Sequence, residues 1–266
     1  VRSGGHDEYW SAPQRAAIEA HVERGGHRAS FSGNTMFWQV RHEGTSMVCH
    51  KYRAHLDDPV VADGRPAEAT GMWADPIVGR PEWSLLGAGS ALGLYPRVGQ
   101  ATPRGVGGFL VHRADHWLVE GTGLGYGDVL GADDGVVGYE TLGCPITFDE
   151  LQLPVPRPLD GLPDSTEIVG WVPSSNLGIG EYPKSIAALS DQGDLEFIAT
   201  RLHGDTTARS LTKVRNGNAV MLTCRPYGDD GGEVVTIGTT DWVFGLPDDP
   251  AVARVTANVL DRLGGG

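Results

Sequence analysis

The sequence is poor in cysteine, with Cys49, Cys144 and Cys224 as its three thiols in 266 residues. An odd, widely spaced set without a C-x-x-C pair is no disulfide framework and no thiolate metal cage. Reduced thiols fit the cytosol best, so we expect a cytoplasmic protein. The sequence also lacks any apolar run near the roughly 20 residues that cross a bilayer, and it shows no signal peptide. We therefore expect no membrane partner.

Positive charge is scarce as well: 21 Lys and Arg stand against 34 Asp and Glu, for a net charge of -13. Such a surface repels nucleic acid and anionic membranes, so we expect neither as a partner. Its simplest effect is solubility. The chain is 40% hydrophobic, and its length is near the point at which one core stops growing. We expect a single domain over residues 1–266.

Several catalytic signatures are missing. Neither G-x-S-x-G nor G-x-C-x-G occurs, which argues against a nucleophile on a strand-to-helix elbow. The absence of G-x-G-x-x-G and of a P-loop argues against nucleotide binding. Gly121–Gly127 is glycine-rich with the wrong spacing, and we interpret it as a tight loop rather than a phosphate cradle. H-E-x-x-H is absent too, and the pair His112 and His116 is interpreted as structural, with metal binding as the alternative.

Alternating helix and strand patterns predict an α/β fold. Ser11 and Pro13 open a helix that Gly25-Gly26 ends, and the strand His27–Ser32 follows, which is typical of half a βαβ unit. We therefore predict a mostly parallel sheet flanked by helices. Further strands are expected at Phe37–Arg41, Phe109–Val111, Glu167–Val172, Leu195–Ala199, Ala219–Thr223 and Glu233–Gly238, a strand or helix piece at Trp117–Val119, a short helix at Glu82–Leu86, and a closing helix from Pro250 to Leu263.

Two stretches depart from this alternation. Residues 57–104 are irregular and rich in Gly and Pro, and we interpret them as a long functional insertion. Residues 151–164 carry four prolines and are interpreted as a linker or an extended crossing segment.

Polar residues follow several of the expected strands. If the strands are parallel, the segments His6–Trp10, Ser32–Thr35, Glu120–Gly123 and Thr239–Trp242 meet at one edge of the sheet, where open α/β sheets bind ligands. The alternative is that they only cap helices.

The segment His6–Trp10 places four titratable side chains in consecutive positions, which suits acid–base chemistry or metal binding. An Asp-Glu pair at a helix N-terminus is the simpler alternative. A strand that leads into His6 would need apolar residues before it, so we expect that the chain is truncated or processed here, or that another segment supplies the start of the fold.

Three segments together resemble a known family: Gly5–Ser11, Ser32–Arg41 and Gly121–Leu124, supported by Thr239–Trp242 and Thr256–Leu263. They are similar to the C-terminal domain of the large subunit of N,N-dimethylformamidase. The resemblance implies a core like that of the class I glutamine amidotransferases, which is flavodoxin-like, without their cysteine. It also implies a mononuclear iron, held by two tyrosines and a glutamate, that activates water to attack a small amide.

Carried onto this sequence, the resemblance makes Tyr9 one tyrosine ligand and Glu82 the glutamate. The second tyrosine position falls on His50 or Tyr52. With His50 the ligands are Tyr9, His50 and Glu82, a set that suits iron or zinc.

The expected function is therefore metal-dependent hydrolysis of an amide. His6, Glu8 and His116 are expected to move protons, and Asn34 and Asp241 to orient substrate or ligands. Trp10, Trp38, Arg41 and Trp242 are expected to contact the substrate. The alternatives are a non-catalytic module that binds a carbohydrate or another ligand, and a subunit that completes its site with a second polypeptide or another copy of itself.

Overall fold

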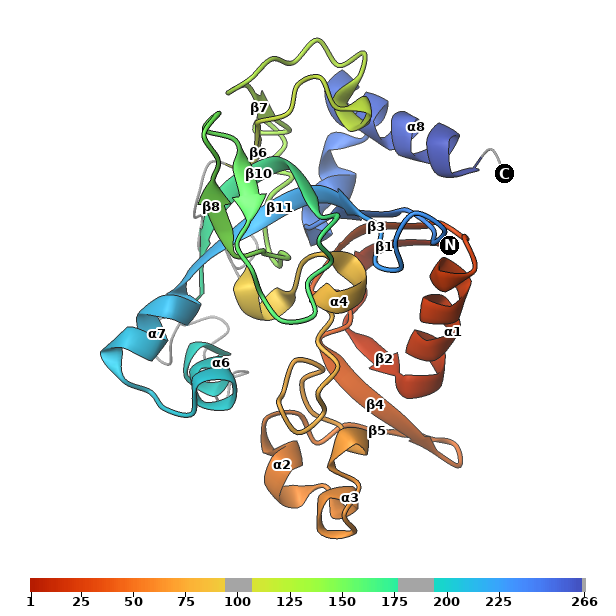
Figure 1. The fold of residues 1–266 in the computed structure, drawn as a ribbon, viewed down its shortest axis with the longest axis vertical. Helices are drawn as coiled ribbons and strands as arrows, with labels where there is room; N and C mark the ends of the chain where they lie inside the picture. Colours follow the sequence, from red (N-terminus) through yellow and green to blue (C-terminus); the bar gives the residue numbers. More distant parts are fainter. Residues whose placement is uncertain (94–106, 177–193, 265–266) are drawn as a thin grey trace.

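The computed structural model describes residues 1–93, 107–176 and 194–264. A curled seven-stranded sheet crosses the molecule in the order β1-β3-β12-β11-β10-β6-β7 (Figure 1). Its strands are β1 (Arg2–His6), β3 (Arg28–Gly33), β12 (Val234–Ile237), β11 (Asn216–Cys224), β10 (Glu167–Ser175), β6 (Phe109–Val111) and β7 (Val129–Leu130).

The prediction of a mostly parallel sheet is wrong. Strands β1, β3 and β12 run parallel to one another, whereas every pairing from β12 through β11, β10 and β6 to β7 is antiparallel. Short apolar runs show that a strand exists but not which way it runs. A flavodoxin-like core is accordingly not confirmed, while the mixed α/β class is.

The two faces of the sheet carry separate cores. On β11, Val220 and Leu222 pack with Val22 of α1 (Ala12–Glu23) and with Leu86 of α4 (Trp83–Leu86). The alternate residue Met221 packs on the other face, together with the buried valines of α8 (Pro250–Gly264). The period of two along a strand explains this division.

A second, smaller sheet has three strands. Its strands are β2 (Tyr9–Ser11), β4 (Trp38–Glu43) and β5 (Ser46–Val48), with β2 parallel and β5 antiparallel to β4. Strands β8 (Ile146–Phe148) and β9 (Pro154–Pro156) pair separately, so the proline-rich stretch is partly a strand. The remaining helices described are α2 (Ala54–Asp57), α3 (Pro59–Ala62), α6 (Asp194–His203), α7 (Ala208–Arg215), and the 3-10 helices η1 (Lys51–Arg53), η2 (Pro66–Glu68), η3 (Ser90–Leu92), η4 (Trp117–Val119) and η5 (Thr240–Gly245).

Helix boundaries follow the capping signals closely. Ser11 caps α1 through a capping box with Gln14, and Asp249 caps α8 by accepting the Ala251 and Val252 N–H groups. The strand expected at Leu195–Ala199 is wrong, because these residues lie inside helix α6. Leu195, Ile198 and Ala199 share one buried helical face, a spacing of three and four that also fits a short apolar run.

The irregular stretch 57–104 forms short helices and loops as far as residue 93, and its residues 94–104 lie outside the described part of the chain. Among the helices described, none is both long and apolar enough to cross a membrane.

Candidate functional site

The carboxyl ends of the three parallel strands lie at one edge of the sheet. His6, the last residue of β1, is paired directly with Gly33, the last residue of β3. Strand β12 lies on the other side of β3, and η5 follows it after Gly238 and Thr239. The segments after these strands therefore meet, as predicted. We call this edge the rim.

The loop after β3 is held in an unusual backbone conformation. Asn34 and Met36 have φ values of 47° and 61°, in the left-handed region that residues other than glycine rarely adopt. The Met36 N–H donates to the Asp7 carbonyl at 2.8 Å, which ties this loop to the segment after β1. Asn34 is buried, and its side-chain Oδ1 has no hydrogen-bond partner within the described residues. Such a combination is typical of a functional site.

A further segment, residues 138–141, also crosses the rim, and the sequence analysis did not predict that it takes part. A Cβ atom on Gly33 would come within 2.0 Å of the Glu140 carbonyl oxygen, so only glycine permits this approach. The Thr240 N–H donates to that carbonyl at 3.0 Å, and Asp241 Oδ2 accepts the Tyr139 N–H at 3.1 Å. These bonds bring the Glu140 side chain to the rim.

Two carboxylates flank one histidine there. His6 Nε2 lies 2.8 Å from Glu140 Oε2 and 3.6 Å from Glu8 Oε2. The shorter contact is at ion-pair distance, and Glu140 Oε2 has no hydrogen bond to the described residues. This contact with Glu140 raises the pKa of His6 in spite of partial burial. Burial, and then the charge of Glu140, raise the pKa of Glu8.

Tyr9 extends this group. Its phenol accepts a short hydrogen bond of 2.5 Å from Lys51 Nζ, and it interacts electrostatically with the neighbouring Glu8 carboxylate. Burial, followed by the charge of Glu8, raises the pKa of Tyr9, so the phenol stays protonated. Tyr139 is half-exposed beside Glu140, and its pKa is raised in the same way. We call His6, Glu8, Tyr9 and Glu140 the rim cluster.

His50 lies next to Lys51 in the chain, and Lys51 contacts Tyr9 of this cluster. The His50 ring Nδ1 is 3.0 Å from Thr70 Oγ1 and 3.4 Å from Asp58 Oδ2. Partners on Nδ1 orient an imidazole and leave Nε2 to act, which is how metal-binding histidines are held. Its alternative Tyr52 donates its hydroxyl to Asp194 Oδ1 at 3.0 Å.

Glu82 has different surroundings. It is fully buried at the start of α4, where Oε1 accepts the Ser90 N–H at 2.9 Å. Burial raises its pKa to about 7, against the nearby positive charge of Arg15. The described partners of Glu82 include no member of the rim cluster.

The predicted substrate-contacting residues are mostly occupied elsewhere. Arg41 pairs with Asp58, its Nη1 lying 2.7 Å from Oδ2. The three tryptophans are buried: Trp10 donates to Asp7 Oδ1 at 2.9 Å, Trp38 packs against Tyr52 and Phe197, and Trp242 donates to Thr256 of α8 at 3.0 Å.

His116 lies at the opposite end of the sheet. Its Nε2 is 3.8 Å from Glu167, the first residue of β10, and Glu233, just before β12, also acts on it. The segment Glu120–Gly123 is likewise away from the rim, because Trp117–Val119 is a 3-10 helix packed on α8. The prediction that this segment joins the other three is wrong.

A family model described as N,N-dimethylformamidase beta subunit-like, C-terminal, matches residues 1–255. The chain belongs to this family. The matched range covers every strand that ends at the rim, and the match confirms the resemblance drawn from the sequence. No curated protein matches the chain. Membership in a dimethylformamidase-like family is consistent with amide hydrolysis in general.

The rim cluster brings an imidazole, two carboxylates and a phenol together at one edge of this formamidase-like domain. Within the described residues, no three His, Cys, Asp or Glu side chains form a group that could hold a metal by themselves. Tyr9 adds an oxygen donor of another type. The sequence analysis missed Glu140. This residue follows the buried apolar pair Val136 and Val137, much as the other rim segments follow their strands. That pattern is the sequence signal that could have identified it.

Proposed function

We propose that the chain hydrolyses the carbon–nitrogen bond of a small amide at the rim cluster. The observation that carries the proposal is the continuous series of contacts from Lys51 through Tyr9 and Glu8 to His6 and Glu140. Helix capping needs none of these side chains, because Ser11 and Gln14 already cap α1.

Two members of the cluster have protonation properties suited to hydrolysis. The raised pKa of Glu8 makes its carboxylate a better proton acceptor for an attacking water. The raised pKa of His6 keeps its ring protonated to higher pH, so that it can give a proton to the leaving amine. One side chain is thus tuned as a base and its neighbour as an acid.

The Lys51 ammonium, which has three N–H donors, lies at the same place and uses one of them on the Tyr9 hydroxyl. Donors fixed in advance around a developing negative charge stabilise the tetrahedral state of amide hydrolysis. Lys51 itself has a positive φ of 51°, which shows that its backbone is held in a defined and uncommon conformation.

The donor set also fits the iron, or alternatively zinc, that the family resemblance implies. Within the described residues, Glu140 Oε2 is buried without a hydrogen bond, and His50 uses its Nδ1 on Thr70, so Nε2 is the ring nitrogen available to a metal. Tyr9 offers a phenol oxygen. We propose Tyr9, His50 and Glu140 as ligands, with Glu140 in the place first assigned to Glu82. A metal bound here would polarise the amide carbonyl and make its bound water more acidic.

The competing idea of a carbohydrate-binding module loses its main support. Stacking on a sugar needs exposed aromatic rings, and Trp10, Trp38 and Trp242 are 8%, 2% and 1% exposed. A partner chain is a separate proposal that the beta-subunit-like family favours. Val243 and Phe244, in η5 directly after Trp242, are 54% and 56% exposed and would be covered by such a partner.

The test is the variant Tyr9→Phe, with Tyr126→Phe as the matched control because Tyr126 is an exposed tyrosine away from the rim cluster. The purified proteins are analysed for bound iron and zinc and for amine release from formamides and acetamides. We expect metal content and hydrolysis to fall in Tyr9→Phe and to persist in Tyr126→Phe. Equal hydrolysis by both variants would refute a role for the rim cluster. If the unmodified protein hydrolyses amides without a bound metal and Tyr9→Phe does not, the rim cluster stands and only the metal is refuted.

A further inference from the structure

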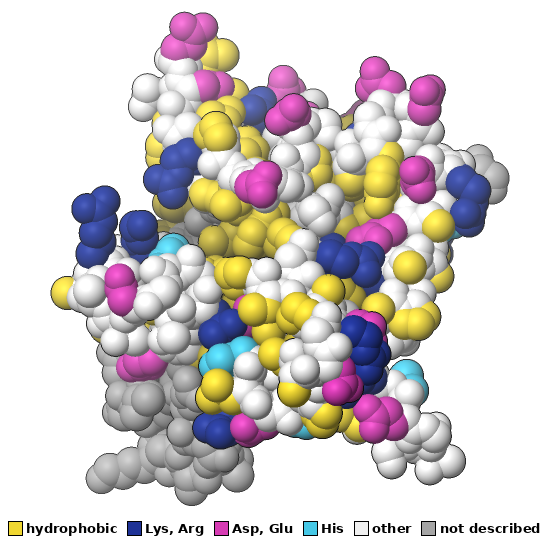
Figure 2. All heavy atoms as spheres, turned by 60° about the horizontal axis from the view of Figure 1, so that its bottom comes forward, with side chains coloured by type: hydrophobic (Ala, Val, Ile, Leu, Met, Phe, Trp, Pro, Cys, Tyr) yellow, Lys and Arg dark blue, Asp and Glu magenta, His cyan; other side chains and the backbone are white. Residues whose placement is uncertain are grey.

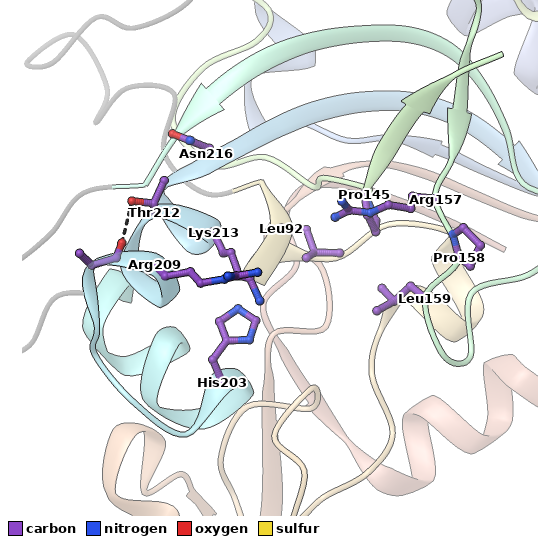
Figure 3. A pocket seen from close by; sticks show the side chains of 11 residues that line it. Leu92, Pro145, Arg157, Pro158, Leu159, His203, Arg209, Thr212, Lys213 and Asn216 are labelled. Atoms are coloured by element: carbon purple, nitrogen blue, oxygen red, sulfur yellow. Dashed lines mark hydrogen bonds between the residues drawn. The ribbon is translucent and has the colours of Figure 1, made fainter. Parts of the chain in front are cut away.

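A hollow of about 840 Å³ lies between the helices α6 and α7 and the segment 145–159 (Figure 3). Its volume is within the range of small-molecule sites. His203, Arg209 and Lys213 line it from the helices, and Arg157 lines it from the opposite wall. Leu92 and Leu159 add apolar surface. The hollow therefore combines an apolar part with a basic part.

The basic side chains have no acidic counterparts there. None of the described residues that line the hollow is Asp or Glu, although the chain carries 34 of them. Within the described part of the chain, Arg157, Arg209 and Lys213 form no ion pair with a carboxylate. At the left of Figure 2, where α6 and α7 lie, Lys, Arg and His side chains stand at the surface together with some Asp and Glu side chains. Positive charge is concentrated here in a protein of net charge -13.

Each of these basic side chains is exposed, as on an ordinary solvated surface. Their convergence is the distinguishing feature, because Arg209, Lys213 and His203 extend into one space that Arg157 approaches from another part of the chain (Figure 3). Burial, and then the charge of Lys213, lower the pKa of His203, while the charge of Asp205 opposes this shift.

We infer that this hollow is a binding site for a small organic anion whose phosphate or carboxylate head meets the basic side chains and whose apolar body contacts the leucines. The guanidinium groups of Arg157 and Arg209 suit either head, because each can donate two parallel hydrogen bonds. The site goes beyond the proposed amide hydrolysis, and its test does not depend on that activity. A nucleic acid is disfavoured as occupant by the net charge of the whole chain.

The test is calorimetric titration of the full chain with phenyl phosphate, phenylacetate and inorganic phosphate. We expect saturable binding of at least one phenyl compound, weaker binding of inorganic phosphate, and an affinity loss of tenfold or more in the double variant Arg209→Gln/Lys213→Gln. Arg157→Gln should weaken binding by itself, since it removes the opposite wall. The control is Arg24→Gln, which removes one positive charge from the end of α1, on the other side of the molecule.

The relative affinities of phenyl phosphate and phenylacetate decide which head the site prefers. The proposal is overturned if neither phenyl compound binds, if the double variant binds like the unmodified chain, or if Arg24→Gln loses as much affinity as the double variant. Thermal unfolding of each variant separates loss of the site from loss of the fold.

Discussion

The two halves of the seven-stranded sheet differ in what their ends bring together. In the parallel half, β1, β3 and β12 end at one edge, and the residues that follow them form the rim cluster and its supports. In the antiparallel half, the ends of β11, β10, β6 and β7 alternate between the two edges. Strand direction therefore decides whether the polar segments after strands can combine into a site.

The largest expected effect is that of Glu140→Gln, which keeps the shape of the side chain and removes its charge. Without the charge of Glu140, His6 loses its proton more easily as the acid of the reaction. We expect kcat for amide hydrolysis to fall by about 10²- to 10⁴-fold, with little change in thermal unfolding. Steady-state kinetics on small amides measure this. Glu167→Gln, at the opposite end of the sheet, is the control and should retain activity. An active Glu140→Gln would show that the parallel half holds no catalytic cluster.

The next effect is that of Gly33→Ala, which tests how the rim is built. The added Cβ would meet the Glu140 carbonyl and the Thr240 N–H, at 2.7 Å from the latter nitrogen, so the segment 138–141 must move. We expect activity to fall and stability to drop by about 1–3 kcal/mol, measured by urea unfolding. Gly4→Ala on β1 is the matched control, because its nearest neighbour would be 3.9 Å away. Equal behaviour of the two variants would contradict the close approach.

A smaller effect is expected in the pH profile of kcat/KM. Activity requires ionised Glu8 and protonated His6, so the profile should be bell-shaped. Because the pKa of Glu8 is raised from 4.5 and that of His6 from 6.5, both limbs should lie above those values. In residual activity of Glu140→Gln, the alkaline limb should move to lower pH, since the contact with Glu140 that holds the His6 proton is lost. An alkaline limb that stays in place would exclude His6 as the acid.

The smallest expected effect is that of His116→Gln. This residue lies beside Glu167, away from the rim, so we expect kcat/KM to change by less than about twofold. Amide hydrolysis assayed beside His6→Gln gives the contrast. A large loss in His116→Gln would mean that the opposite end of the sheet also takes part, and the comparison between the two halves would fail.

Local signals in the sequence were sufficient for much of the fold. Ser11 and Asp249 mark helix starts through side-chain hydrogen bonds to nearby N–H groups, so α1 and α8 are predictable from neighbours in the chain. Strand β1 was not predictable from apolar content, because Arg2–His6 forms a half-exposed edge strand of small and polar residues. Strand direction was not predictable either, since it depends on contacts between distant segments.

The site shows the same division. The segment around His6 was recognisable because titratable residues stand together in the chain. Glu140 reaches His6 across more than a hundred residues of sequence, by way of Gly33 and Thr240. No local pattern encodes that approach. Glu82, chosen from the sequence, is buried under the sheet beside the Ser90 N–H.

The helices α6 and α7 lie in the connection between two strand residues that are paired with each other in the sheet. The chain leaves β10 at Ser175 and returns to β11 at Asn216, and these two residues are paired directly with each other. The pairing of β10 with β11 thus fixes both ends of this connection, whatever lies between them. We therefore expect substitutions in α6 and α7 to leave the strand register intact, so that the proposed basic hollow can be altered without a change at the rim.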